Sequence, residues 1–458
     1  MKRIAAPLAL LTAAGLSACS MIPAYHRPPV SVPADWREPD AASSAAVVET
    51  GAIAADWWKR YDSAELDRVM ADVLAGNTDL QAALRRVDQA RANLRIAGAA
   101  LQPNVDAAGN AARGYSDSGN HQAPVSSSYS GQLSVGYEID LWRRNQAAVE
   151  AAGERVTASR FDHDALALVT TADAAKTFFQ ILSLRDRQTI ARDNLATEGE
   201  VLTIVEARFR EGASSALEVS QQKTVLANAQ ASLAALAQQQ RVAENSLAVL
   251  RGQPPQASRI SSDGLAGVNL PAIAASQPSS LLERRPDIRS AEAQLIAANA
   301  DIGAARAAFF PQLKLAFDTT LAGFPGSVAT SLAGSLLAPI FEGGRLKGEL
   351  QLSQAKQAEL VETYRKAVLT AFQETEDALS AVRTSQLRRA SLATAVEQAK
   401  RAYLISRQRF EAGAIDFITL LNTQASQLQA EDALAQARLD QVNASVDLFK
   451  ALGGGWTE

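Results

Sequence analysis

The sequence predicts an α + β membrane protein whose chain contributes four β-strands and several very long helices. Three observations carry this prediction: a unit that occurs twice, long stretches without proline, and segments in which apolar and polar residues alternate. Of the 458 residues 47% are hydrophobic but only 5% are aromatic, and alanine is the most frequent residue type. Such a composition cannot fill many thick globular cores, and it suits long helices whose backbones approach closely.

The N-terminus predicts export and lipidation. Residues 1–18 combine two early basic residues with an apolar stretch from Ile4 to Leu16, which is too short to span a bilayer as a helix. The stretch ends in Leu-Ser-Ala before Cys19, which resembles the bacterial lipobox, so we expect cleavage before Cys19 and covalent lipid, including palmitate, on it. Ser20 follows instead of Asp, which in this resemblance implies sorting to the outer membrane. The alternative is a signal peptide with an incidental cysteine.

Charge and composition exclude several classes of protein. The formal charge of −4 is unlike the basic surface that nucleic-acid binding needs, so we expect no nucleic acid. A single cysteine excludes a disulfide framework and a cysteine-based zinc site. The histidines are not spaced with carboxylate partners as metal ligands are, and nothing nominates a nucleophile with its base. We therefore expect no catalytic residue, no metal and no cofactor other than the lipid on Cys19.

The chain contains two copies of one unit of roughly 200 residues, which indicates a duplicated architecture. Asp79 and Pro103 in the first copy match Asp287 and Pro311 in the second, with the same spacing. Two segments that match at an offset of 201 residues are 207–213 and 408–414. The expected divisions are a signal peptide at 1–18, a lipidated N-terminal segment at 19–76, repeats at 77–252 and 285–452, a linker at 253–284 and a tail at 453–458.

Each copy opens with a helix and continues with two alternating segments. Thr78 is the expected N-cap of the first helix. Within 127–141 the odd positions are mostly apolar and the even positions polar, which is typical of a strand with one buried face. The four strands are expected at about 104–116, 127–141, 312–323 and 328–341, of which the first has the weakest pattern.

The rest of each copy predicts helices of unusual length. No proline occurs between residues 125 and 253 or after Pro339. The stretch from Arg345 to Glu411 alone would be about 100 Å long as a helix, at 1.5 Å per residue. Gly212 and Gly413 interrupt the pattern, so each copy is expected to form a helical hairpin with glycine at its tip. The two helical stretches are 143–252 and 344–452.

Four strands of this length raise the question of a membrane. A strand of about 10 to 14 residues is long enough to cross a bilayer at a tilt. Four strands cannot close a barrel, and an open edge in lipid leaves backbone groups unpaired at several kcal/mol each. Strands in a membrane would have to be shared, with eight from two chains or twelve from three. The alternative for the strands alone is an ordinary soluble antiparallel sheet.

Several short motifs occur in a specific order along the mature chain. They are CSMIPAYHRP from Cys19, the pair Trp57-Trp58, NTDL from Asn77, RRPDI from Arg284, FP at Phe310, PIFEGGR from Pro339 and ALGGGW from Ala451. Their order, together with the duplication, resembles the TolC-like outer membrane factors of tripartite efflux pumps and type I secretion. The likeness is greater to their OprM-like, NodT-type lipoprotein branch, and it covers essentially the whole mature chain.

The resemblance implies a homotrimer with a 12-stranded transmembrane β-barrel, to which each chain contributes four strands. A long periplasmic α-helical barrel would continue it, belted by a mixed equatorial domain in residues 21–76, the linker at 253–280 and the C-terminal tail. The implied partners are a periplasmic membrane-fusion adaptor protein, an inner-membrane RND-type transporter and outer membrane lipid. The implied location is the outer membrane of a Gram-negative bacterium, with a lipid anchor and a periplasmic extension.

The resemblance also gives roles to residues near the hairpin tips. The residues that match the family's Arg-x-x-x-Gly pattern for meeting the adaptor are Arg208, Gly212, Arg409 and Gly413. Ile418 and Asn422 are expected to line the narrowest point of the periplasmic gate, with Asp416 nearby. Relatives carry Asp where this chain has Asn422, and amides would constrict the pore without the charge repulsion of carboxylates. Arg143 stands at a strand-to-helix exit where relatives often carry glycine.

We therefore expect an outer membrane exit duct of a tripartite efflux pump, which passes small-molecule drugs or toxic compounds to the outside, and not an enzyme. Untwisting of the inner hairpin helices would widen the closed mouth when the adaptor docks. One alternative is the outer membrane duct of type I protein secretion. The other is a coiled-coil envelope lipoprotein without a channel, which would leave the four alternating strands without a role.

Overall fold

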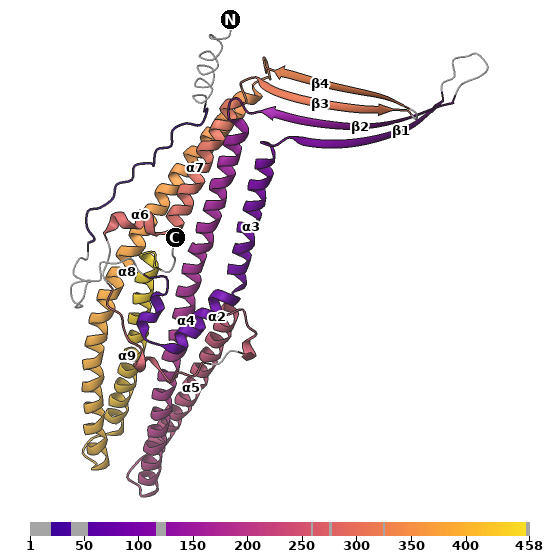
Figure 1. Ribbon diagram of the computed structural model, residues 1–458. Coiled ribbons are helices and arrows are strands. Elements are labelled where there is room, and N and C mark those ends of the chain that lie inside the picture. The colour runs from indigo at the N-terminus through magenta and orange to yellow at the C-terminus, as the bar shows by residue number, and fades with distance from the viewer. Residues whose placement is uncertain are drawn as a thin grey trace. The chain divides into compact units, whose positions relative to one another are not determined.

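Long helices and one four-stranded sheet make up the described parts of the computed structural model, residues 20–37, 54–115, 125–257, 260–273, 277–323 and 326–454 (Figure 1). The helices are α2 (Ala64–Gly76), α3 (Thr78–Ala99), α4 (Arg144–Arg210), α5 (Ala216–Leu250), α6 (Leu281–Arg284), α7 (Pro286–Ala307), α8 (Arg345–Glu411) and α9 (Phe417–Ala451). Short 3₁₀ turns are η2 (Trp57–Tyr61), η3 (Pro255–Ala257), η4 (Leu265–Gly267) and η5 (Pro278–Ser280). The strands are β1 (Asn104–Tyr115), β2 (Val125–Ile139), β3 (Gln312–Ala322) and β4 (Ser327–Leu337). The signal peptide and the expected lipidation site Cys19 lie outside the described residues.

The chain divides into two compact units, each built from three segments. Unit 1 consists of Met1–Val30, Leu84–Phe161 and Ile288–Ala367, and it contains the whole sheet. Unit 2 consists of Ser31–Ala83, Asp162–Asp287 and Val368–Glu458, and it contains both helical hairpin tips. One boundary lies between Val30 and Ser31, and the other four fall inside α3, α4, α7 and α8.

The sheet of unit 1 is antiparallel, with its strands in the order β1-β2-β3-β4 (Figure 1). The register aligns apolar residues across all four strands, as in the row Val105, Val135, Phe317 and Leu332. The next row, whose side chains point to the other face, is Asp106, Ser134, Asp318 and Ser331. The predicted alternation is confirmed, and it gives the sheet one apolar and one polar face.

Two strand ends differ from the expected positions for identifiable reasons. β4 ends at Leu337 rather than near residue 341, because Pro339 has no N–H to continue a ladder. β2 ends at Ile139 rather than 141, and the side chain of the next residue, Asp140, bonds the start of α4 instead. Its Oδ2 accepts the backbone N–H of Gln146 at 2.8 Å, which satisfies one of the free donors at the start of α4.

The exit from β2 into α4 contains an uncommon backbone conformation. Arg143 has φ +57°, and among the described residues it is one of only two non-glycine positions with positive φ. The matching position in the second repeat is Gly344, with φ +91°. Arg143 Nη2 bonds Glu150 Oε1 at 3.0 Å and its Nε donates to Gln146 at 2.9 Å. These exposed contacts accompany a conformation for which glycine is the usual residue.

An extended N-terminal segment lies along α7 in unit 1. Arg27 forms a two-pronged ion pair with Glu292, at 2.7 and 2.8 Å, and the Glu292 side chain is only 10% exposed. Ile22 approaches Gly303 so closely that a Cβ there would stand 2.5 Å from Ile22 Cγ1. Bidentate arginine–carboxylate pairs fix geometry well, so the chain that follows position 19 is held in place on this helix.

Aromatic rings form the centre of the core in unit 2. Trp57 stacks on Phe449 at a centroid distance of 5.2 Å, and Tyr61 packs on Phe179 at 5.0 Å. All four side chains are fully buried. The Tyr61 hydroxyl and Ser445 Oγ lie 2.6 Å apart, which satisfies the polar end of the ring.

The start of α3 corrects one expectation about capping. Thr78 is the first helical residue, and the cap is Asn77, whose Oδ1 accepts the backbone N–H groups of Asp79 and Leu80 at 3.0 Å each. Asn77 is buried, and its Nδ2 donates to the carbonyl of Leu250 at 2.9 Å. An asparagine carries its acceptor and its donor on separate atoms, so it can cap one helix and bond a second one at once.

Candidate functional site: a two-faced sheet and paired hairpin tips

The apolar face of the sheet lies open in the single chain. Large side chains on it are strongly exposed, among them Leu332 at 79%, Val105 at 63% and Tyr129 at 62%. Soluble proteins rarely leave so continuous an apolar surface in water. Just after β4, Ile340 and Phe341 are even more exposed, at 92% and 89%.

The other face of the sheet is polar, and its two outer edges are open. Gln132 Nε2 donates to Asp318 Oδ1 at 3.3 Å, and Asn104 Nδ2 donates to Asp106 at 2.7 Å, so polar side chains interact with one another there. Within the described residues β1 pairs only with β2, and β4 pairs only with β3. The outer edges of β1 and β4 therefore present unpaired backbone groups, which suit pairing with other strands.

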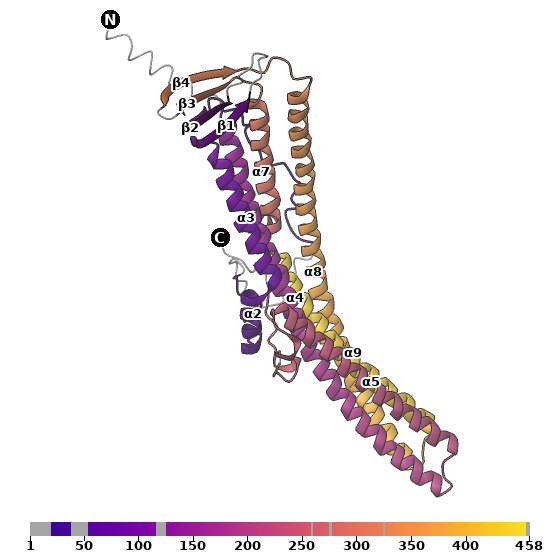
Figure 2. The same ribbon diagram turned by 90° about the vertical axis from the view of Figure 1, so that its right-hand side faces the viewer.

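The two hairpins of unit 2 end in tips with matching backbones (Figure 2). Gly212 and Gly413 both have φ +73°. In the first tip the N–H of Ala213 donates to the carbonyl of Arg208 at 2.8 Å, and in the second tip Ala414 donates to Arg409 at the same distance. This pattern is the Schellman motif, in which glycine supplies the left-handed conformation that ends a helix. The expected role of glycine at both tips has a direct structural basis.

The two arginines of the tips have different surroundings. Arg208 Nη1 donates to the carbonyl of Phe410 at 2.8 Å, and its guanidinium lies 4.6 Å from the centre of the Phe410 ring. Arg208 thus joins the first hairpin to the second within the chain. Arg409 is exposed, and its side chain has no hydrogen bond or ion pair within the described residues.

The residues expected at the gate lie on the first turns of α9. Asp416 is the N-cap of this helix, and its Oδ1 accepts the N–H of Thr419 at 2.8 Å, which lowers the pKa of the carboxyl. Ile418 and Asn422 are both exposed and are four residues apart, so they share one helix face. Phe417 and Leu420 are buried in the core between the hairpins.

A buried polar cluster above the tips carries no signal in the sequence. Glu198 of α4 and Gln222 of α5 are fully buried, and Gln222 Nε2 donates to Glu198 Oε2 at 2.7 Å. Burial raises the pKa of the Glu198 carboxyl, although the bond from Gln222 partly opposes this shift. Within the described part of the chain, the amide of Gln424 and one oxygen each of Glu198 and Gln222 have no partner. A proton on Glu198 would add one donor to this cluster, enough for one of the acceptor oxygens.

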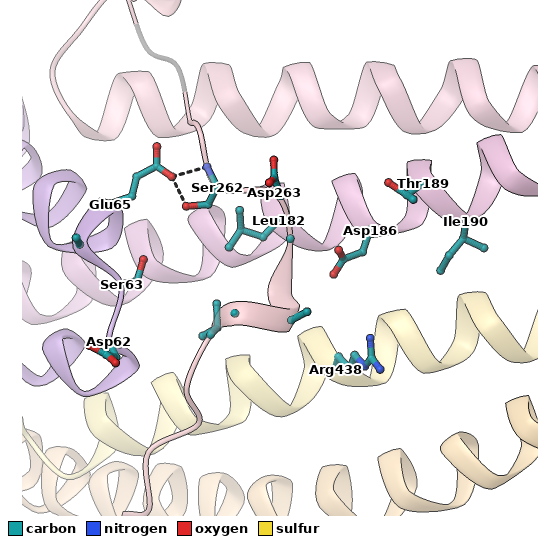
Figure 3. A pocket seen from close by; sticks show the side chains of 15 residues that line it. Asp62, Ser63, Glu65, Leu182, Asp186, Thr189, Ile190, Ser262, Asp263 and Arg438 are labelled. Atoms are coloured by element: carbon teal, nitrogen blue, oxygen red, sulfur yellow. Dashed lines mark hydrogen bonds between the residues drawn. The ribbon is translucent and has the colours of Figure 1, made fainter.

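A cavity of about 800 Å³ lies in unit 2, between η4, the start of α2 and the helices α4 and α9 (Figure 3). Glu65 accepts the backbone N–H of Ser262 at 2.8 Å and is also bonded by Ser261, and these bonds outweigh burial and lower its pKa. Asp186 accepts the N–H of Leu265 at 3.0 Å, but burial dominates and raises its pKa, with Arg438 opposing. These carboxylates hold the linker against the helices, which is a structural role.

Metal ligands and membrane-spanning helices are the two remaining features of interest. Over the described ranges, no group of three or more His, Cys, Asp or Glu residues is placed to hold a metal ion. One described helix, α4, is long and apolar enough to cross a membrane, but 56% of its most apolar window is buried inside the protein, as in an ordinary core helix.

A sheet with one apolar face, one polar face and two open edges, combined with long helical hairpins, defines the subunit of a membrane channel. A family model described as outer membrane efflux protein matches residues 69–253 and 277–454. The chain belongs to the outer membrane efflux protein family. The two matched blocks correspond to the two halves of the duplicated sequence.

Individual relatives agree with this assignment. The chain is 40% identical to the pyoverdine export outer membrane protein OpmQ of Pseudomonas aeruginosa, over 96% of this chain and 95% of OpmQ. It is 34% identical to the outer membrane protein OprJ of the same species, over 98% and 96% of the two chains. Both proteins are matched over nearly their whole length, and the expected family is confirmed.

Solved structures agree on the fold. The chain is similar to the outer-membrane channel OprN, with a TM-score of 0.87 and 28% identity over 96% of this chain and 100% of that one. It is also similar to the open state of the MtrE outer membrane channel of Neisseria gonorrhoeae, with a TM-score of 0.84 and 29% identity over 95% and 98%. The expected fold class and the role as an outer membrane efflux channel are confirmed.

Proposed function

We propose that three copies of this chain form the outer membrane exit duct of a tripartite efflux pump. The observation that carries the proposal is the sheet with an uncovered apolar face and unpaired edges at β1 and β4. Lipid satisfies the apolar face, and only strands of neighbouring chains satisfy the edges. Three chains supply twelve strands, enough for a barrel with an open lumen, whereas eight strands fill their interior with side chains.

The periplasmic end meets a membrane-fusion adaptor, which connects the duct to an inner-membrane RND-type transporter. The matched tips around Gly212 and Gly413 support this part of the proposal, because they present two similar surfaces per chain. Arg208 holds the two tips together through Phe410 and so keeps their spacing fixed for docking.

The gate is formed by Ile418 and Asn422, with Asp416 as the residue that fixes the start of their helix. Both side chains are exposed on one face of α9, and three copies would place six such side chains around the bore. Neutral amides give this constriction less attraction for cations than a carboxylate ring would.

Lipid on Cys19 adds a second attachment to the membrane. The segment after it is fixed along α7 by the ion pair of Arg27 with Glu292, so the anchor would be attached to a rigid part of unit 1. One acyl chain binds a membrane only weakly, and the embedded strands supply the rest.

The cargo is small organic molecules. The relatives support this class, since they are named for export of pyoverdine, of solvents and of toluene. Deletion of the gene should increase sensitivity to, or retention of, compounds in a panel of siderophores, solvents, dyes and antibiotics.

Purified full-length protein tests the duct directly. Native mass measurement in detergent should give three chains per particle, and planar bilayers should show discrete conductance steps. A particle with one chain that inserts in membranes, or a trimer that never conducts in either adaptor-free or adaptor-bound form, would contradict the proposal.

A further inference from the structure

The residues that correspond to Arg208 and Phe410 in the other repeat form no such contact with each other within the described part of the chain. An offset of 201 residues relates Arg208 to Arg409 and Phe209 to Phe410. The backbones agree as well: the N–H of Gly212 donates to the carbonyl of Phe209 at 3.1 Å, and that of Gly413 donates to Phe410 at 2.9 Å. Arg409 and Phe209 therefore stand in the same local geometry as the pair that joins the hairpins.

The burial of the two phenylalanines differs strongly. Phe410, which lies under the Arg208 guanidinium, is 6% exposed, whereas Phe209 is 46% exposed. The difference extends up the helix, since Ile204 packs on the core between the hairpins but its counterpart Ile405 is 43% exposed. Ile204 and Phe410 thus lie on the sides of the two hairpins that face each other within the chain. Their counterparts, Ile405 and Phe209, lie on sides that the chain itself leaves open.

We propose that Arg409 of one chain donates to the Phe209 carbonyl of the neighbouring chain and stacks on its ring. In a closed ring of alternating hairpins, the second hairpin of each chain stands beside the first hairpin of the next. The contact between repeats inside the chain then recurs between chains. This inference rests on the proposed trimer, and it makes Arg409 a contact between subunits rather than one with the adaptor.

The chemistry of the contact explains the choice of residue. A helix C-terminus carries partial negative charge on its free carbonyls, which favours a cation. A guanidinium also stacks on an aromatic face better than a lysine ammonium does. The planar N–H donors of the guanidinium can bond the carbonyl at the same time. Six such contacts, three within chains and three between them, would hold the closed ends together.

Cysteine pairs distinguish the two kinds of contact. In trimers of the full-length protein, Phe209→Cys with Arg409→Cys should give covalent dimers and trimers with a short bismaleimide, with loss of more than half of the monomer band. Arg208→Cys with Phe410→Cys should react within one chain and stay at monomer mass. The parent, whose only cysteine is Cys19, and each single-cysteine variant should give no such product.

A double-mutant cycle supplies a second readout. Arg409→Ala and Phe209→Ala should each lower the temperature at which trimers dissociate in detergent. The double variant should lower it no further than Arg409→Ala alone, because Phe209→Ala removes the ring but keeps the backbone carbonyl. Native mass that shows trimers without intermolecular products from the first cysteine pair, or additive effects in the cycle, would overturn this inference and leave the duct intact. Absence of any trimer would overturn the proposed function itself.

Discussion

The exit from β2 into α4 offers a sharp test of backbone reasoning, because Arg143 occupies a position that favours glycine. A non-glycine residue in the left-handed region costs roughly 1–2 kcal/mol. The ion pair of Arg143 with Glu150 has exposed partners, at 37% and 43%, and such pairs contribute about 0.2–1 kcal/mol. The conformational cost is therefore at least as large as the contribution of the side chain.

Two substitutions separate these effects. Arg143→Gly and Arg143→Ala both remove the ion pair, but only glycine removes the strain. We expect the glycine variant to be about 1 kcal/mol more stable than the alanine variant, and equal to or more stable than the parent. Gly344 occupies the matching position of the second repeat, with φ +91°. Gly344→Ala introduces the strain that Arg143→Gly removes, so this variant should be destabilised by roughly 1–2 kcal/mol.

The assay is urea unfolding of the purified protein at fixed detergent concentration, followed by far-ultraviolet circular dichroism. Midpoints should rank Arg143→Gly above Arg143→Ala, with equal slopes. Equal midpoints for these two variants would refute the reasoning, because the positive φ would then carry no cost.

Three further perturbations concern unit 2. Glu198→Gln should stabilise the hairpins at pH 7, since burial raises the pKa of this carboxyl and the native state resists its ionisation; the gain should disappear as the pH falls below the ordinary range of glutamate. Phe449→Ala should destabilise by about 3–5 kcal/mol, because the ring is fully buried and stacked on Trp57. Arg285→Met should lower the free energy of unfolding by about 1–3 kcal/mol. The Arg285 side chain is buried, at 8% exposure, but its partner Glu374 is 40% exposed and can regain water when the ion pair is lost.

Matched controls sharpen these expectations. Glu200→Gln, at an exposed ion pair, should show no comparable pH dependence, and a pH-independent effect of Glu198→Gln would contradict the burial argument. Val249→Ala, at a position 64% exposed, should change stability by less than about 0.5 kcal/mol. Arg388→Met removes an exposed pair with Asp440 and should have a similarly small effect; a loss equal to that of Arg285→Met would deny any special role to burial.

The sign of the pH effect follows from proton binding. In the unfolded chain Glu198 releases its proton at an ordinary pKa, whereas the native chain keeps the proton to a higher pH. Between these two pKa values the native state binds more protons, so the stability contribution is fully present below the lower value and is lost as pH rises through the higher one.

Local patterns predicted the elements of the fold well. Alternation located the four strands because the side-chain period of a strand is two, and the glycines at 212 and 413 marked the tips because both take positive φ. The internal repeat showed that the two hairpins are copies, which is why the Arg208 contact and its counterpart could be compared at all.

Long-range contacts were beyond the sequence. Nothing adjacent to Glu198 shows that it faces Gln222, because their contact depends on how α4 packs on α5. The bond of Asn77 to the carbonyl of Leu250, 173 residues away, is likewise invisible in the sequence, whereas its capping bonds to Asp79 and Leu80 are local. The roles of Ile418, Asn422, Arg409 and Cys19 stay predictions, because they depend on neighbouring chains, partners or lipid.

The central claim is that the four-stranded sheet lies in lipid on one face and in water on the other, and single cysteines along β3 test it most directly. With the protein in liposomes, cysteines at Lys314 and Asp318 should react with a charged, membrane-impermeant thiol reagent. Fluorophores on cysteines at Leu315 and Phe317 should instead be quenched by brominated lipid. Reaction that alternates with a period of two is the expected result. Uniform reaction at all four positions, without lipid quenching, would show that the strands lie in water and would contradict the account.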